Sequence, residues 1–348
     1  MDRRRFSALA LLAFLSCAMP PAPAVAQEQT DRKIADLLDE AERLKPLQTV
    51  IVAKDGEVIG QRGYRGHSVT TPTNIKSASK SVISALVGIA IDKGVLEGPD
   101  QKIAPLLEPD LPHDPDPRIH EITIGNLLSM QAGLERTSGP NYGRWVQSGN
   151  WVRFVLSRPF ADDPGGGMLY STGSTHLLSA ILTRTTGRST LELARDWLGP
   201  VEGFSIANWD RDPQGIYFGG NQMAMSPRSL LAFGELYRNE GRAGGEQVLS
   251  PEWIEASWQR RTNSVFNGDG YGYGWFLRQI AGHEVRYAWG YGGQMLYIAP
   301  ALELTVVMTS DEANPSARSG HRDDLHALMG DIIRALKGEE QAQGDSGG

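Results

Sequence analysis

The sequence has almost no cysteine, since Cys17 is the only one in 348 residues. It lies in an N-terminal stretch that we expect to be removed, so the mature chain would carry no thiol. That excludes disulfides and cysteine-ligated metal sites, and about 320 residues can bury an ample core without either. The seven histidines form no strong metal-ligand pattern. His321 and His326 are five residues apart near the C-terminus, and we expect both at the surface.

Basic runs and long apolar runs are also missing. The formal net charge is −7, and removing residues 1–26, which hold three arginines and one aspartate, leaves −7 − 2 = −9. An acidic chain without a basic cluster argues against a nucleic-acid partner. The apolar run Phe6–Met19 is too short to span a membrane, so we expect no membrane span in the mature protein.

Residues 1–26 predict an export signal. Arginines precede the apolar run, and the segment Ala24–Ala26 has the small-x-small pattern of a cleavage site. The segment Arg3–Phe6 is similar to a twin-arginine signal, which would export the protein already folded. Acylation at Cys17, as in a lipoprotein, is an alternative in a poor sequence context. We therefore expect a periplasmic or secreted protein.

The order of predicted elements indicates an α+β fold. Thr49–Ala53 and Val58–Gln61 are β-rich runs joined through Asp55-Gly56, which is typical of a hairpin. Helical patterns follow, and β character returns before a last helix over 323–337. The other helices are expected at 30–45, 124–130, 151–156, 175–185, 190–198, 227–239 and 251–260, and the later strands at 274–280, 285–289, 294–298 and 304–309.

Strands at both ends of the chain predict one antiparallel sheet built from N-terminal and C-terminal pieces and flanked by helices. The region of about 96–248 would form a mainly helical second lobe, with a site between the two parts. We expect a single domain over 27–340 and a flexible polar tail over 341–348.

Ser77 and Lys80 lie at the start of a helix that is predicted to continue through Ala90. Their spacing places them on one face of the helix, about 5–6 Å apart, so the lysine amine can take the proton of the serine hydroxyl. The helix start also directs N–H groups and the positive end of the dipole toward developing negative charge. The alternative is a capped amphipathic helix with a solvated lysine.

Two glycine-rich segments add candidate groups. The segment Asp163–Gly173 holds Tyr170 and lacks the Gly-Lys-Ser/Thr ending of a phosphate-binding loop. A phenol beside a lysine ammonium would become more acidic and could relay a proton. In Ala288–Tyr297, glycines would let a substrate lie against a strand edge and offer a free N–H to an oxyanion. The alternatives are a turn with a buried tyrosine and an ordinary hairpin turn.

Together these segments resemble the motifs of serine hydrolases related to class C β-lactamases and D-alanyl-D-alanine carboxypeptidases. The resemblance covers about residues 45–335, and the ending Gly290–Gln294 is most similar to the 6-aminohexanoate-dimer hydrolase branch, which includes esterases. The matching motifs are Ser77–Lys80, Tyr170–Thr172 in place of Tyr-x-Asn, and Tyr291–Gly293 in place of Lys-Thr-Gly or His-x-Gly, with Thr123–Leu134 and Tyr271–Trp275 as further similar stretches.

The resemblance implies a β-lactamase/transpeptidase-like fold and acyl transfer without a metal or organic cofactor. Ser77 would attack the carbonyl of a small-molecule ester, amide or peptide, while Lys80 and Tyr170 share the proton transfers. The resemblance assigns the oxyanion hole to the N–H groups of Ser77 and Gln294, and substrate binding to Thr172, Tyr291, Gly292 and Gly293.

Two departures from the family pattern bear on the substrate. Thr172 stands where Asn is commonest, and Tyr291 stands where β-lactam-hydrolysing members have Lys. Both favour ester or amide hydrolysis over β-lactamase activity. The alternatives are a penicillin-binding D,D-peptidase or weak β-lactamase, and a non-catalytic binding homologue. A Gly-x-Ser-x-Gly pattern at Gly344–Gly348 has no His or Asp after it, so we interpret it as a chance match and not as an α/β-hydrolase signal.

Overall fold

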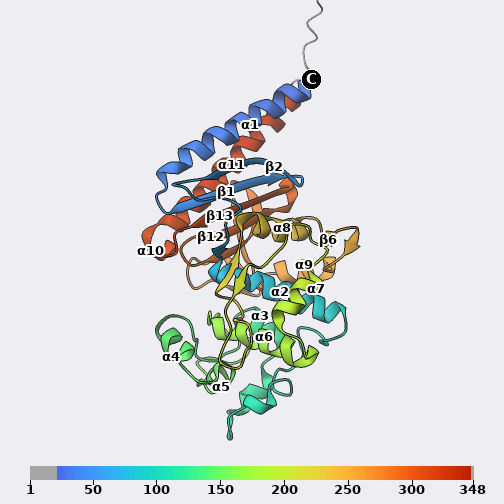
Figure 1. The fold of residues 1–348 in the computed structure, drawn as a ribbon, viewed down its shortest axis with the longest axis vertical. Coiled ribbons are helices and arrows are strands. Elements are labelled where there is room, and N and C mark those ends of the chain that lie inside the picture. The colour runs from blue at the N-terminus through green and yellow to red at the C-terminus, as the bar shows by residue number, and fades with distance from the viewer. Residues whose placement is uncertain (1–21, 346–348) are drawn as a thin grey trace, which may run out of the picture.

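A computed structural model describes residues 22–345 of the chain (Figure 1). Its centre is an eight-stranded sheet in the order β2-β1-β13-β12-β11-β10-β9-β8, in which the paired strands run antiparallel. The strands are β1 (Leu47–Lys54), β2 (Glu57–Gly63), β8 (Thr262–Asn263), β9 (Gly270–Tyr271), β10 (Phe276–Ile280), β11 (His283–Gly290), β12 (Gln294–Ala299) and β13 (Leu304–Ser310). Because β1 pairs with β13, one sheet unites both ends of the chain, as predicted.

The hairpin of β1 and β2 follows from its two turn residues. Asp55 and Gly56 have φ angles of 50° and 82°. Two successive positive φ values are the requirement of a type I′ turn, which Asp-Gly meets at low steric cost. The turn brings Lys54 opposite Glu57 and starts the register of the edge of the sheet.

The central strands are apolar on both faces because helices cover both. In β1, Val50 and Val52 face the side that α1 (Ala22–Glu40) and α11 (His321–Asp345) cover, whereas Ile51 faces the core of the rest of the molecule. Figure 1 shows α1 and α11 lying side by side over the sheet, with α8 (Pro227–Arg238) against the opposite face. Such double coverage explains the near-continuous apolar runs in these strands.

Between β2 and β8 the chain is mainly helical, as predicted for about residues 96–248 (Figure 1). The strands of this segment are short, and β3 (Thr73–Asn74), β5 (Met223–Met225) and β4 (Asn208–Trp209) form a small separate sheet. The helices are α2 (Ser79–Asp92), α3 (Ile124–Leu128), α4 (Tyr142–Val146), α5 (Trp151–Leu156), α6 (Thr172–Thr186), α7 (Thr190–Trp197), α8 and α9 (Pro251–Trp258), with a β6–β7 pair at Arg242–Ala243 and Glu246–Gln247.

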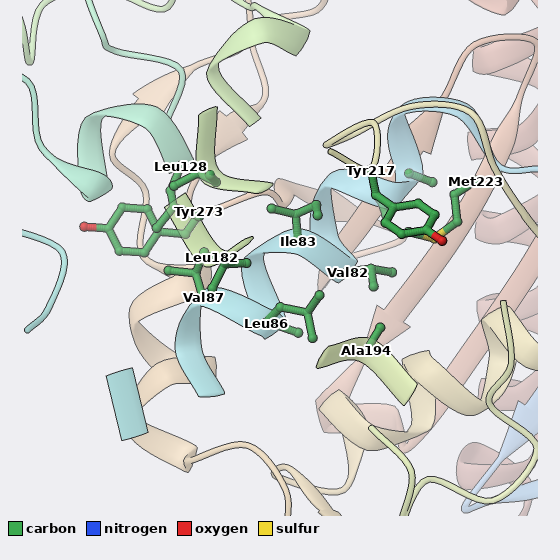
Figure 2. Packing of buried hydrophobic residues seen from close by; sticks show 14 of the residues in the cluster. Val82, Ile83, Leu86, Val87, Leu128, Leu182, Ala194, Tyr217, Met223 and Tyr273 are labelled. Atoms are coloured by element: carbon green, nitrogen blue, oxygen red, sulfur yellow. The ribbon is translucent and has the colours of Figure 1, made fainter. Parts of the chain in front are cut away.

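Helix α2 is buried along nearly its whole length, and it joins the two parts of the molecule. Figure 2 shows Val82 and Ile83 among side chains of the helical lobe, including Tyr217 and Met223. The helix also buries hydroxyl groups, and these are satisfied: Ser84 Oγ, for example, donates to the Tyr273 carbonyl at 2.7 Å. A helix held on every side gives Ser77 and Lys80, at its N-terminal end, a fixed support.

The surface prediction for two histidines is wrong. His321 and His326 are only 3% and 5% exposed, because both lie on the side of α11 that packs against the sheet. His321 Nε2 lies 2.9 Å from Ser310 Oγ, and His326 Nδ1 lies 3.0 Å from the Tyr297 hydroxyl. Burial, with Arg278 and other charges nearby, lowers the pKa of His326 to about 3.

Two helices extend beyond their predicted limits. Helix α11 continues to Asp345, past the helix end predicted at 337, and α1 starts at Ala22, before the helix start predicted at 30. The predicted domain limits of 27 and 340 stay a prediction. Most of the predicted export signal lies outside the described residues. Within the described part of the chain, none of the helices combines the length and apolar character needed to cross a membrane.

Candidate active site

Ser77 lies in a 3₁₀ turn, Lys76–Ala78, that leads directly into α2. Lys76 has a φ of 50°, an uncommon value for a residue with a side chain, so the backbone is bent just before the serine. Two bonds hold this bend, because Lys76 N–H donates to Asn74 Oδ1 at 2.9 Å and Ser79 Oγ donates to the Lys76 carbonyl at 2.7 Å. Ser77 itself stays partly exposed.

Lys80 is 2% exposed and directs its amine at Ser77. Its Nζ lies 3.0 Å from Ser77 Oγ, 3.2 Å from Thr172 Oγ1 and 2.7 Å from the carbonyl oxygen of Gly220. The predicted serine–lysine contact is therefore present. The alternative of a solvated lysine is wrong, because α2, α6 and the Gly220 segment enclose the side chain.

Burial lowers the pKa of Lys80 from 10.5 to about 7. A neutral amine has two hydrogens and one lone pair. With the hydrogens directed to the Gly220 carbonyl and the Thr172 hydroxyl, the lone pair is left facing Ser77. The same three contacts that would hold an ammonium thus also orient the neutral amine for accepting the serine proton.

Tyr170 lies beside this pair, and its ring centroid is 5.1 Å from Lys80 Nζ. Its side chain is 8% exposed. Burial raises the pKa of Tyr170 to about 12, and a hydrogen bond with Ser77 lowers it only in part. The prediction of a more acidic phenol is therefore wrong: burial raises the pKa of the phenol more than its hydrogen bond with Ser77 lowers it, and a lysine whose own pKa is about 7 is only partly charged at neutral pH. At neutral pH Tyr170 carries its proton.

Thr172 begins α6 and takes part in the hydrogen bonds around Lys80. Its Oγ1 contacts both Lys80 Nζ and Ser138 Oγ, the latter at 3.1 Å, and Ser138 Oγ also accepts the Thr172 N–H at 2.9 Å. At 4% exposure, its hydroxyl is engaged with these groups. Ser138 was not singled out from the sequence, where nothing marks a serine 34 residues before the threonine it contacts.

The turn from β11 to β12 approaches the Ser77 turn from the other side. A Cβ on Gly290 would overlap the Ile75 carbonyl oxygen and lie 3.1 Å from Lys76 Cβ. Gln294 pairs with Gly290 in register, so its backbone lies at the same end of the strands. The structure thus brings Gln294 to the vicinity of Ser77, while its side-chain amide donates to the Ser310 carbonyl at 2.6 Å.

The three residues between these strands differ in exposure. Tyr291 is 48% exposed. Gly292 and Gly293 have φ angles of 88° and 112°, and added Cβ atoms would lie 2.6 Å from the Asp311 carbonyl oxygen and 2.9 Å from Leu325. The tight turn and its packing against β13 and α11 therefore account for both glycines, and their contact with substrate stays a prediction.

A buried pair that the sequence did not reveal holds the Gly220 segment in place. His176, on α6, is fully buried, with Nε2 3.0 Å from Asp212 Oδ2. Its Nδ1 accepts the Gly219 N–H at 3.3 Å, so Nε2 carries the hydrogen and donates to Asp212. This pair fixes the chain immediately before Gly220, whose carbonyl contacts Lys80.

Lys76, the residue before Ser77, forms an ion pair with Glu312. Lys76 Nζ lies 2.5 Å from Glu312 Oε2 and 3.3 Å from Gln222 Oε1. Glu312 follows β13, and Gln222 belongs to the helical lobe, so the ammonium links the two parts of the molecule. In the described residues, no group of three or more His, Cys, Asp or Glu side chains is placed to hold a metal ion.

Comparison with known proteins identifies the family. The β-lactamase family profile matches residues 39–330. The 6-aminohexanoate-dimer hydrolase of Paenarthrobacter ureafaciens is 24% identical over 91% of this chain and 86% of its own length. Among solved structures, EstCE1, described as a hydrolase with promiscuous acyltransferase activity, has a TM-score of 0.72 at 19% identity, covering 90% of this chain and 99% of its own.

A penicillin-binding protein homologue from Caulobacter crescentus has a TM-score of 0.66 at 16% identity, covering 92% of this chain and 98% of its own. Likeness at such identities shows the fold, and the profile match over most of the chain shows the family. The chain therefore belongs to the β-lactamase family and is a serine hydrolase of that family.

Proposed function

We propose that the protein is an exported hydrolase that cleaves an ester or amide bond through an acyl-enzyme on Ser77. The observation that carries the proposal is the contact of 3.0 Å between Ser77 Oγ and the amine of Lys80, whose pKa burial lowers to about 7. Near neutral pH a large share of Lys80 is an uncharged base, and the reactive serine is its hydrogen-bond partner.

In the first step, Lys80 Nζ takes the Ser77 hydroxyl proton while Oγ bonds to the carbonyl carbon. The oxygen becomes negatively charged, and the N–H groups of Ser77 and Gln294 stabilise it. The tetrahedral intermediate then expels the alcohol or amine, which takes its proton from the Tyr170 phenol. Tyr170 is in turn reprotonated by the Lys80 ammonium, so the proton removed from Ser77 reaches the leaving group.

In the second step, water attacks the acyl carbon while Lys80 takes its proton. The bond between the acyl carbon and Ser77 Oγ then breaks, the carboxylic acid leaves, and the same groups return the proton to Ser77 Oγ. The high pKa of Tyr170 suits this role, because a phenol that stays protonated at neutral pH can donate when the leaving group develops charge. Thr172 and the Gly220 carbonyl hold Lys80 in place throughout.

The test is the intact mass of the protein after reaction with a fluorophosphonate, followed by p-nitrophenyl acetate, an amide analogue and a labelled penicillin assayed side by side. One adduct on Ser77 and turnover of the acetate are expected. Ser77→Ala should lose the adduct and at least about three decades of rate while remaining folded. A variant that keeps more than about a hundredth of the rate would contradict the assignment of the nucleophile.

Export rests on the sequence of residues 1–26 alone. Cleavage after Ala26 would remove the first turn of α1, which starts at Ala22, and leave the helix to begin at Gln27. Cell fractionation and the N-terminal sequence of the purified protein test this. Retention of the leader, or a lipid on Cys17, would contradict the proposed cleavage.

A further inference from the structure

Exposed apolar side chains gather beside the proposed nucleophile. Among the described residues, four large apolar side chains are exposed: Val265 at 58%, Phe266 at 42%, Tyr291 at 48% and Val58 at 39%. Val58 lies on β2, at the opposite edge of the sheet from β8. The other three belong to two turns next to the site. Single exposed apolar residues are ordinary, whereas a group of them marks a binding surface.

Phe266 connects this group to the chemistry. Its ring meets the ring of Tyr170 edge-to-face at 5.2 Å between centroids, and that of Trp289 at 5.6 Å. Tyr291 follows Trp289 by two residues, at the turn that approaches Ser77. The three rings in contact, Phe266, Tyr170 and Trp289, are called the aromatic wall below. Nearly half of Phe266 and Tyr291 remains open to solvent and available to a ligand.

Hydrogen bonds to residues of β10 and β11 fix the loop that carries Phe266. The Tyr287 hydroxyl donates to Asp269 Oδ2 at 2.6 Å and accepts from Asn267 Nδ2 at 3.0 Å, and Arg278 Nη1 lies 3.3 Å from Asp269. Within the loop, Ser264 N–H donates to the Asp269 carbonyl at 2.7 Å. A ring presented on an ordered loop binds a ligand without a large further loss of conformational entropy.

Trp289 is fixed as well. Its Nε1 donates to Ser316 Oγ at 3.2 Å, and the Arg322 guanidinium lies 5.3 Å from the centre of its ring. Both supports of Phe266, the Tyr170 ring and the Trp289 ring, therefore belong to ordered parts of the molecule. An exposed side chain with ordered neighbours on both sides is a preformed surface.

The position of Tyr170 indicates which part of a substrate would contact the aromatic wall. In the proposed function, the Tyr170 phenol gives its proton to the departing alcohol or amine. Phe266 packs on that ring, so the aromatic wall borders the side of the site where the leaving group lies. We infer that the aromatic wall binds an apolar leaving group, and that the substrates are esters or amides of apolar alcohols or amines. This inference rests on the proposed function.

The test compares two series of esters by kcat/KM, which reports acylation of Ser77. In one, acetate is joined to straight-chain alcohols of increasing length, and in the other the acyl chain of p-nitrophenyl esters is lengthened. We expect kcat/KM to rise with alcohol length by up to about fourfold for each methylene that becomes buried, at about 0.8 kcal/mol per group. Phe266→Ala should flatten this dependence, while Phe266→Leu, which keeps an apolar side chain, should keep much of it.

Val58→Ala is the matched control, since it removes an exposed apolar side chain far from the site, and its alcohol series should equal that of the wild type. An unchanged slope in Phe266→Ala would overturn the inference, as would loss of the acyl-length dependence in place of the alcohol-length dependence. If Ser77 takes a fluorophosphonate and hydrolyses acetates without any dependence on the alcohol, this inference fails alone. If Ser77 is unreactive, the proposed function fails with it.

Discussion

Burying Lys80 should cost the protein stability, and the cost should depend on pH. The pKa of this amine falls from 10.5 in water to about 7 in the folded protein, because burial disfavours the ammonium. Below about pH 7 both the folded and the unfolded chain carry the proton, and the full penalty applies. Between the two pKa values the unfolded chain holds one more proton, so stability rises with pH.

Each pH unit in this window changes the free energy of unfolding by about 1.4 kcal/mol. The prediction concerns Lys80→Met, which keeps the length and burial of the side chain but cannot be charged. The variant should be more stable than the wild type, and this advantage should be larger near pH 7 than near pH 9 by about 2 kcal/mol. The Gly220 carbonyl loses a donor in the variant at both values, so that loss cancels in the comparison.

Urea unfolding of both proteins at several pH values between about 6 and 9 measures the difference. Lys93→Met is the control, because Lys93 follows α2 and is exposed, and its difference from the wild type should not vary with pH. If the difference in unfolding free energy between Lys80→Met and the wild type were also independent of pH, burial would not lower the pKa of Lys80 to about 7. The argument for a neutral base would then fail.

The same titration should appear in the rate, because kcat/KM should rise with pH through a midpoint near 7 as Lys80 loses its proton. Lys80→Arg should lose this rise with pH together with most of the activity, since a guanidinium keeps its proton. Near-normal kinetics of Lys80→Arg would contradict the role of Lys80 as a base. A cephalosporin carries a carboxylate that needs a cation, but Glu312 already neutralises Lys76, so wild-type protein should hydrolyse p-nitrophenyl acetate and only traces of a cephalosporin. Tyr291→Lys should raise the cephalosporin-to-ester ratio of kcat/KM by about 10–100-fold. A wild-type preference for the cephalosporin would refute this prediction. Gly290→Ala should lower kcat about 10²-fold, because the new Cβ would displace the turn before Ser77. Gly149→Ala is the control, since its new Cβ would meet nothing within 4 Å, and its kcat should equal that of the wild type. Equal kcat values for Gly290→Ala and the wild type would contradict the close packing of the turn.

The sheet could be predicted because each strand carries its own signal. The hairpin follows from Asp55-Gly56, and the C-terminal strands follow from short β-rich runs between turn residues, so β12 and β13 lie within one residue of prediction. Pairing of β1 with β13 required only that strands at both ends of the chain share one sheet. These are local properties of the sequence combined with one rule of topology.

The contact between Ser77 and Lys80 could also be predicted, since the two residues are three apart where the 3₁₀ turn runs into α2. The other partners of Lys80 could not. Gly220 is 140 residues away in the chain, and a backbone carbonyl leaves no mark in a sequence. The His176–Asp212 pair that holds this segment unites a helix with a loop, and neither residue stands in a recognisable motif.

Burial explains the errors in electrostatics. A lysine ammonium beside Tyr170 predicts a more acidic phenol, and a polar residue near the C-terminus predicts a surface position for His321. Both predictions assume water around the group. In the folded protein the pKa of Lys80 is lowered to about 7, so its amine is only partly charged at neutral pH, and α11 packs His321 against β13. Desolvation is the largest cause of the pKa shifts of Lys80, Tyr170 and His321.

The site therefore combines two residues close together in the sequence, Ser77 and Lys80, with surrounding groups from distant segments. The two residues supply a hydroxyl and an amine at the required spacing, which many helices with a serine and a lysine also do. In the proposed mechanism, the amine can act as a base because Thr172, from α6, and the Gly220 carbonyl enclose it, exclude water and accept both hydrogens of the neutral form. Reactivity of Ser77 should thus be lost on changes that let water reach Lys80, even where Ser77 and Lys80 remain in contact.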